Sequence, residues 1–437
     1  MEFLLLGIFS AVLLACIFTG VSVIYAMFLG LVVFFGYGLI KKKTWKQMLI
    51  FSWQGMKTAK NVLLTFMLIG MMTAIWRASG SIAFIVYYAS EICVPSLMLL
   101  TAFLLCSMIS FLTGTSFGTA ATMGVICMTM AKSMNIPEIL AGGAILAGVY
   151  FGDRCSPVST SALLVSELTK TNLYENLKEM ARTAIVPFTV SCGAYWILGI
   201  QTHAGKTEET IRTVLSEFYH LSIWTLAPVV VVLVFSFLHI EVKRTLAIST
   251  LAGIFIAVLI QKYPLSELPS LCILGFSTDN QQINRLMSGG GIISNMKVVV
   301  IVGISSCYAG IFKGTNFLHG IKEFIGKLNN RITPFGTTLL ISVITAAVSC
   351  NQTLSIMLTN QLCGENNVAN KEFALSLENS AVIVAPLIPW SIASAVPLAF
   401  IDAPTQSIFA AIFLYLLPIC YFIECKKESK KQPDNVG

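Results

Sequence analysis

Apolar stretches of about twenty residues recur along the whole chain, and no other feature limits its possible folds so strongly. A stretch of that length can cross the hydrocarbon core of a bilayer as a helix. Charged residues make up only 11% of the chain, and the mean hydropathy is +0.81, whereas about a quarter of the residues in a soluble domain are charged. Because lipid offers the backbone no hydrogen-bond partners, and no alternating strand pattern is present, the sequence predicts an all-α polytopic membrane protein.

The apolar pattern predicts about ten to twelve crossings, because several of the expected spans are too short or too broken to cross alone. The segment 82–94 is short enough to be re-entrant. The N-terminus lacks the basic region of a signal peptide, so it is expected to form the first membrane helix. The expected spans lie near 2–18, 21–40, 61–79, 96–113, 115–131, 138–152, 180–200, 222–240, 245–261, 292–312, 334–350, 352–363, 372–400 and 405–423.

The polar residues divide the chain into two membrane halves. Residues 201–221 form the most polar interior segment and are expected to link an N-terminal half, 1–200, to a C-terminal half, 222–425. Lysines follow the second span, and a lysine-rich tail occupies 426–437. Since basic flanks stay in the cytoplasm, both termini are expected there, with the protein in a bacterial-type cell membrane.

Composition excludes several classes of function. The net charge of +7 comes from loop and tail lysines, which fits membrane flanks rather than a nucleic-acid surface. The twelve cysteines include no C-x-x-C pair, and the four histidines form no metal-type cluster. The chain has no G-x-x-x-x-G-K-[ST] loop. We therefore expect no cofactor and no enzyme activity.

The two halves resemble each other weakly. Arg77 matches Lys313, an offset of 313 − 77 = 236, and Ser110 matches Ser349, an offset of 349 − 110 = 239. Paired, interrupted hydrophobic segments are the best sequence indication of a secondary transporter's binding site. The paired segments are 64–80 with 300–316, 108–123 with 345–360, and 152–164 with 378–393.

Two polar breaks interrupt the first half. In "FLTGTSFGTAAT" (111–122), small residues can simply allow close helix packing, but an unwound segment would free oxygens for a cation. In "YFGDRCSPVSTSALL" (150–164), Asp153 is too costly to face lipid. Either it pairs with Arg154 at a helix end near the interface, or it binds Na⁺ or a proton. The candidate cation and proton ligands are Asp153, Ser156, Ser159, Thr160, Thr115 and Ser116.

Two further breaks lie in the second half. The stretch "CNQTLSIMLTNQ" (350–361) carries Asn351, Gln352 and Thr353, whose polar side chains either bridge helices or bind the ion. In "SLENSAVIVAPLIPW" (376–390), Glu378 and Asn379 precede a run broken by two prolines. Glu378 is either a helix-end residue in water or part of the site.

Three basic residues complete the candidate set. Arg77 and Lys313 each end an apolar run, and such side chains commonly extend to the interface. Alternatively, either one neutralises an intramembrane acid or binds a substrate carboxylate. Arg154 is a third candidate for a charge partner.

The motifs resemble those of the NhaC family of sodium/proton antiporters, within the ion-transporter superfamily. "GTSFGT" (114–119), "FGDRCSPVSTS" (151–161) and "APLIPWS" (385–391) are similar to three family signatures in the same order, and the similarity covers most of the chain. The chain departs from the family pattern in three places. "STSALL" carries no acid, Asn379 replaces an Asp, and a base stands at Arg77.

The resemblance implies two inverted repeats whose broken or re-entrant helices cross near mid-membrane. It implies Na⁺/H⁺ antiport by alternating access, with Na⁺ and H⁺ competing at Asp153, so transport should rise with pH while Asp153 titrates. The lost acid and the extra base also suit the alternative of a Na⁺- or H⁺-coupled transporter of a small carboxylate or amino acid. A channel is a third class. The sequence leaves the oligomeric state open, a homodimer included.

Overall fold

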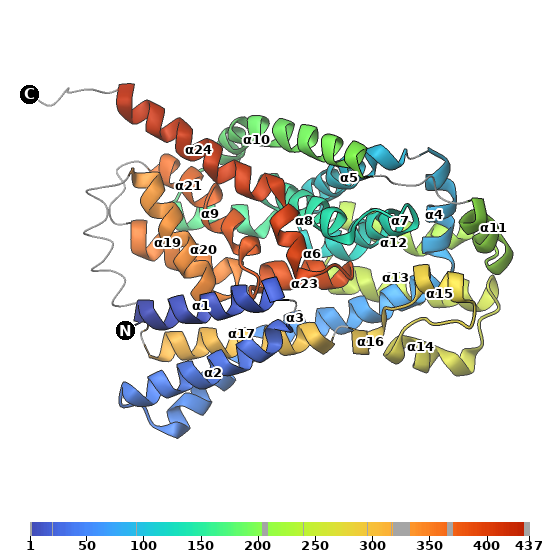
Figure 1. Cartoon of the computed structure of the whole chain (residues 1–437), viewed down its shortest axis with the longest axis horizontal. Helices are drawn as coiled ribbons and strands as arrows, with labels where there is room; N and C mark the ends of the chain where they lie inside the picture. Colours follow the sequence, from blue (N-terminus) through green and yellow to red (C-terminus); the bar gives the residue numbers. More distant parts are fainter. Residues whose placement is uncertain are drawn as a thin grey trace, which may run out of the picture.

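The structure is a computed structural model that describes residues 2–19, 21–92, 94–202, 209–238, 240–294, 296–315, 317, 333–364 and 370–431. These residues are almost entirely helical (Figure 1). They contain no strand, and a single isolated bridge joins Phe276 to Gly289. The predicted all-α class of a polytopic membrane protein is confirmed.

Within the described residues, the first part of the chain contains ten α-helices. A π-helical turn, η2 (Ala120–Gly124), joins α6 to α7, and a short turn, η1 (Pro95–Leu97), precedes α5. The helices are α1 (Glu2–Thr19), α2 (Val23–Ile40), α3 (Trp45–Ala78), α4 (Ser81–Ile92), α5 (Met98–Thr113), α6 (Ser116–Thr119), α7 (Val125–Ser133), α8 (Glu138–Cys155), α9 (Thr160–Thr169) and α10 (Leu173–Gln201).

The second part contains more and shorter elements. The α-helices are α11 (Glu209–Phe218), α12 (Ala227–Phe237), α13 (Val242–Leu259), α14 (Leu268–Leu274), α15 (Gln281–Met287), α16 (Gly291–Ser294), α17 (Met296–Gly314), α19 (Pro334–Ser349), α20 (Gln352–Cys363), α21 (Asn370–Glu378), α22 (Ala381–Val384), α23 (Ile392–Phe400) and α24 (Ile412–Lys431). The short turns among the described residues of this part are η3 (Ile223–Leu226), η4 (Leu265–Glu267), η6 (Ala385–Leu387) and η7 (Thr405–Ala410).

Breaks reduce the number of helices that could cross a membrane unaided. Within the described ranges, two unbroken helices, 95–113 and 173–201, are long and apolar enough, and the number rises to five if each of three bent pairs counts as one span. The bends are 61° between α3 and α4, 97° between α11 and α12, and 58° at 387–392. Four further apolar helices are shorter than a span. The predicted crossings were counted as apolar runs, and several of those runs are interrupted in the structure.

Several helix boundaries differ from those predicted. α3 begins at Trp45, not near residue 61, because Thr44 and Gln47 form a capping box with distances of 3.3 Å and 3.0 Å. The predicted span 372–400 is divided among α21, α22, η6 and α23. Within the predicted linker, residues 203–208 lie outside the described residues and α11 occupies 209–218. α24 continues to Lys431, so the tail is helical up to that residue, and 432–437 lie outside the described residues.

Glycines bring α3 and α17 into direct backbone contact. A Cβ added at Gly55 would lie 2.0 Å from the carbonyl oxygen of Ser306, and one at Gly310 would lie 2.0 Å from that of Phe51. No side chain fits such a gap, so the two helices pack through small residues, as membrane helices commonly do.

We expect Gly310→Ala to lower the thermal midpoint of the purified protein in detergent, because overpacking costs about 1–3 kcal/mol. Gly193→Ala on α10 is the matched control, since its Cβ would meet nothing within 4 Å. Equal midpoints for the two variants would contradict this packing.

Candidate functional site

The breaks after α5 and α19 have the same backbone geometry. Gly114 and Cys350 both end their helix in the left-handed conformation, with φ of 65° and 54°. The next residues, Thr115 and Asn351, are extended and cap the following helix, accepting from a backbone N–H three residues on at 3.1 Å and 3.3 Å. The offset is 350 − 114 = 236, the same as between Arg77 and Lys313. The predicted match of Ser110 with Ser349 is therefore wrong by three residues.

A second pair of breaks also matches. Ser156 and Ile388 are both extended, each precedes a proline, and Ser159 and Ser391 then cap α9 and α23. In both breaks the N–H of the capping serine donates to the carbonyl of the extended residue, at 3.2 Å and 2.9 Å. The offset is 388 − 156 = 232. At this offset the residue of the second half that corresponds to Asp153 is an alanine, Ala385. The parallel predicted between 152–164 and 378–393 thus holds at the prolines and not at the acids.

Asp153 lies where three of these breaks meet. It is in the last turn of α8, beyond the predicted end of that span, and its side chain is buried. Ser159 Oγ lies 3.5 Å from Oδ1, Gln352 Nε2 lies 3.4 Å from Oδ2, and the backbone of Ser116 also hydrogen bonds to the carboxyl group. The two measured contacts are long and come from uncharged groups. A buried carboxyl group is thus held loosely among neutral donors.

The other predicted ligands divide into two groups. Three predicted ligands are buried near Asp153 or in the break that follows it, namely Ser116, Ser156 and Ser159. The hydroxyl oxygen of Ser156 already accepts a hydrogen bond from the N–H of Val158 at 3.3 Å. Thr160 and Thr353 lie in the first turns of α9 and α20 and are exposed. The structure does not bring these two threonines to Asp153.

Arg154 does not pair with Asp153. Its guanidinium donates to the carbonyl of Met180 at 3.1 Å, to Thr183 Oγ1 at 3.1 Å and to Asn379 Oδ1 at 2.6 Å. Adjacent residues on a helix point about 100° apart, so the two charges face different neighbours. Both Arg154 and Asn379 are fully buried, so this hydrogen-bond network is an internal one. The predicted alternative of an Asp153–Arg154 ion pair is therefore wrong.

Arg77 and Lys313 lie away from Asp153. The guanidinium of Arg77 packs against Gly289, and the groups that act on its charge are Asp402 and Tyr219. Lys313 is exposed and lines a cavity. Neither residue is therefore placed to neutralise Asp153 in this structure.

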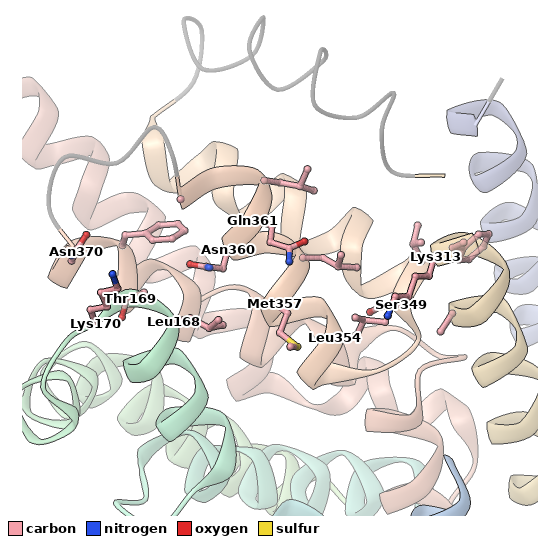
Figure 2. Close-up of a pocket in the computed structure, with 17 residues that line it drawn as sticks. Leu168, Thr169, Lys170, Lys313, Ser349, Leu354, Met357, Asn360, Gln361 and Asn370 are labelled. Carbon is pink, nitrogen blue, oxygen red and sulfur yellow. The ribbon is translucent and has the colours of Figure 1, made fainter. Parts of the chain in front are cut away.

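Two cavities approach the breaks after α5 and α19. The larger, of about 1030 Å³, includes Ser349, Leu354 and Leu358. Figure 2 shows Lys313 and Ser349 at one end of it and Thr169, Lys170 and Asn370 at the other. The smaller, of about 190 Å³, includes Thr113, Gly118 and Thr122, each of which lies 236 residues before one of the three residues named for the larger cavity. The two cavities thus occupy matching places in the two halves.

Sequence reasoning missed the support that Tyr150 gives to the helix turn of Asp153. Tyr150, one helical turn before it, donates its hydroxyl to the carbonyl of Ala393 at 2.5 Å and joins α8 to α23. Ser161 donates to the backbone carbonyl of Asp153 at 3.3 Å. The i, i+3 spacing of Tyr150 and Asp153 on one helix face was the available indication.

The sequence of this chain is similar to those of proteins named as antiporters. A sequence model of the Na⁺/H⁺ antiporter family matches residues 148–423, more than half of the chain. An uncharacterized Na⁺/H⁺ antiporter of Haemophilus influenzae is 28% identical over 358 residues, which cover 78% of this chain and 76% of that protein.

Two further relatives match more of the chain. The malate-2H⁺/Na⁺-lactate antiporter of Bacillus subtilis is 25% identical over 404 residues, which cover 89% of this chain and 86% of that protein. The Na⁺/H⁺ antiporter NhaC of Alkalihalophilus pseudofirmus is also 25% identical over 404 residues, which cover 90% and 87%.

Proposed function

The chain belongs to the Na⁺/H⁺ antiporter family, and from this premise we propose that it exchanges Na⁺ for H⁺ across a membrane, with Asp153 as the site that the two cations share. Its membership, together with the NhaC relative, confirms the family resemblance of the motifs. The relatives above are antiporters by name, which supports a transporter rather than an enzyme. No cofactor is proposed beyond the transported ions.

One observation carries the assignment to Asp153. It is a buried carboxyl group at the meeting point of three helix breaks, and its hydrogen-bond partners are uncharged. One carboxylate cannot hold Na⁺ and a proton at once, so binding of either ion displaces the other. Hard cations bind oxygen atoms, and we propose Ser159 and Ser116 as neutral oxygen ligands. Gln352 presents its amide nitrogen to Asp153 in this structure, so its oxygen would join them only after the amide turns over.

The two matching cavities support alternating access. We propose that the larger cavity is the open route to Asp153 from one side and the smaller cavity the closed route from the other. The larger lies among α9, α17, α20 and α21, on the side of the molecule where α1 begins and α24 ends (Figure 1). The lysine-rich end of α24 supports a cytoplasmic location for that side, in a cell membrane. The halves 1–200 and 222–425 would then move relative to each other.

Cysteines at the matched positions Thr122 and Leu358 test these routes. In Leu358→Cys we expect fast labelling by a membrane-impermeant thiol reagent from the cytoplasmic side, and in Thr122→Cys slow labelling from the opposite side. As Na⁺ concentration and pH are varied, the two rates should change in opposite directions, after subtraction of the rate for unsubstituted protein. Labelling of both from one side, or rates that rise together, would contradict alternating access through these cavities.

A second candidate function rests on the lining of the larger cavity. Lys170 and Lys313 lie at its two ends, amide side chains lie between them, and no acid is among its described lining residues. Its volume is in the range that holds small organic ligands. A Na⁺- or H⁺-coupled carrier of a small carboxylate or amino acid is therefore the alternative, in which Lys313 rather than Arg77 binds the substrate carboxylate.

A further inference from the structure

Glu378 is a second buried acid, and its position is unusual. It is the last residue of α21, directly before the break that separates α21 from α22, and its side chain is fully buried. Neither carboxyl oxygen has a hydrogen-bond partner. A buried polar atom without a partner is rare in native proteins and requires an explanation.

Two other unpartnered groups accompany Glu378. The Nδ2 of Asn379 and the Nε of Arg154 are also buried without a partner, although Arg154 uses its terminal nitrogens fully. Three elements therefore meet here, since α8 carries Arg154, α10 carries its partner Thr183, and α21 carries Glu378.

The charges around Glu378 come from α8 alone within the described residues. Arg154 attracts its carboxylate form and Asp153 repels it. Cys155 is the third titratable group on that helix that interacts with it. α21 also packs against α9, α10, α19, α20 and α22. Glu378 is thus electrostatically linked to the proposed ion site through one neighbouring helix.

The hydrogen-bonding pattern indicates the neutral acid. A carboxylate buried without a donor loses its hydration and gains nothing in return, which costs several kcal/mol. The uncharged acid avoids most of that penalty. If the acid loses its proton, the free N–H of Arg154 is the nearest cationic donor, so the charged form has a partner available nearby.

We propose that Glu378 carries a second proton in the transport cycle, alternating between a neutral acid and a carboxylate paired with Arg154. The inference rests on the exchange proposed at Asp153. In the Na⁺ step both carboxyl groups are ionised and one Na⁺ is bound, whereas in the H⁺ step both are protonated. Two protons therefore move against each Na⁺, and one net charge crosses the membrane per cycle.

The ratio of protons to Na⁺ is measured as a balance point in proteoliposomes. With the membrane potential clamped at zero by K⁺ and valinomycin, an about tenfold Na⁺ gradient is opposed by pH gradients of increasing size until a pH dye reports no net flux. A tenfold gradient of either ion carries the same free energy. Net flux therefore stops at a pH gradient of about 1 unit if one proton is exchanged for each Na⁺, and at about 0.5 unit if two protons share the free energy of one Na⁺.

We expect wild type and Glu378→Asp to balance at about 0.5 pH unit and Glu378→Gln at about 1 pH unit. Glu372→Gln is the matched control, because Glu372 is an exposed acid on the same helix, and it should behave as wild type. A wild-type balance at about 1 pH unit, an unshifted Glu378→Gln, or a folded Glu378→Gln that exchanges nothing would overturn the proposal. Absence of any Na⁺-dependent flux in wild type would instead refute exchange at Asp153.

Discussion

Asp153→Asn abolishes proton-driven uptake of labelled Na⁺ into proteoliposomes and also abolishes exchange of labelled for unlabelled Na⁺. Both losses are expected because asparagine neither gains a proton nor offers the negative charge that offsets the cost of dehydrating Na⁺. The hydrogen-bond partners of Asp153 are uncharged, so none of them supplies that charge at this point. A variant that lost only proton coupling would still exchange Na⁺ for Na⁺.

Asp279→Asn is the matched control, since Asp279 is exposed and distant in sequence from every break. It should transport as wild type does. In wild type, uptake should rise with pH over the range in which Asp153 titrates, because Na⁺ binds only the ionised form. Wild-type uptake in Asp153→Asn, with the variant shown to be folded, would refute the assignment.

Gly114→Ala should reduce exchange by at least about tenfold and destabilise the protein. Gly114 has a φ of 65°, which costs a residue with a Cβ about 1–2 kcal/mol. The new Cβ would also lie 2.7 Å from the carbonyl carbon of Val158, in the break that follows Asp153. Overpacking there adds about 1–3 kcal/mol and displaces Ser116 from Asp153. The measurements are the exchange rate and the thermal midpoint.

Cys350→Gly is its matched control. Cys350 has the same backbone conformation at the corresponding break and already carries a side chain. Removing that side chain relieves no clash and should leave most of the exchange intact. If Cys350→Gly were as damaging as Gly114→Ala, the close approach of the breaks at Gly114 and Val158 would not be the cause.

The sequence locates the breaks well because their chemistry is local. A glycine followed by a hydroxyl residue at 114–115 and a proline at 157 end or interrupt a helix whatever surrounds them. The predictions placed polar segments at both sites, and the structure has breaks there. The short helices α14 and α15 were missed because each has only seven residues, and α16 falls at the start of the predicted span 292–312.

Partners across the chain could not be predicted. A pair of Arg154 with Asp153 was one of two alternatives that the sequence left open, yet the shortest contact of Arg154 is to Asn379, 225 residues away. Gln352 reaches Asp153 across 199 residues. Such pairs depend on how the broken helices cross, which a single sequence with a weak internal repeat does not define.

The most direct test of the central claim uses purified wild-type protein in liposomes that contain a pH dye and no organic solute. A Na⁺ gradient is imposed across the membrane, and liposomes with Asp153→Asn serve as the comparison. The account predicts a prompt Na⁺-dependent pH change in wild type that is absent from the variant. No change from folded wild type, with flux appearing only after a small carboxylate or amino acid is supplied, would contradict it and favour the organic-substrate carrier.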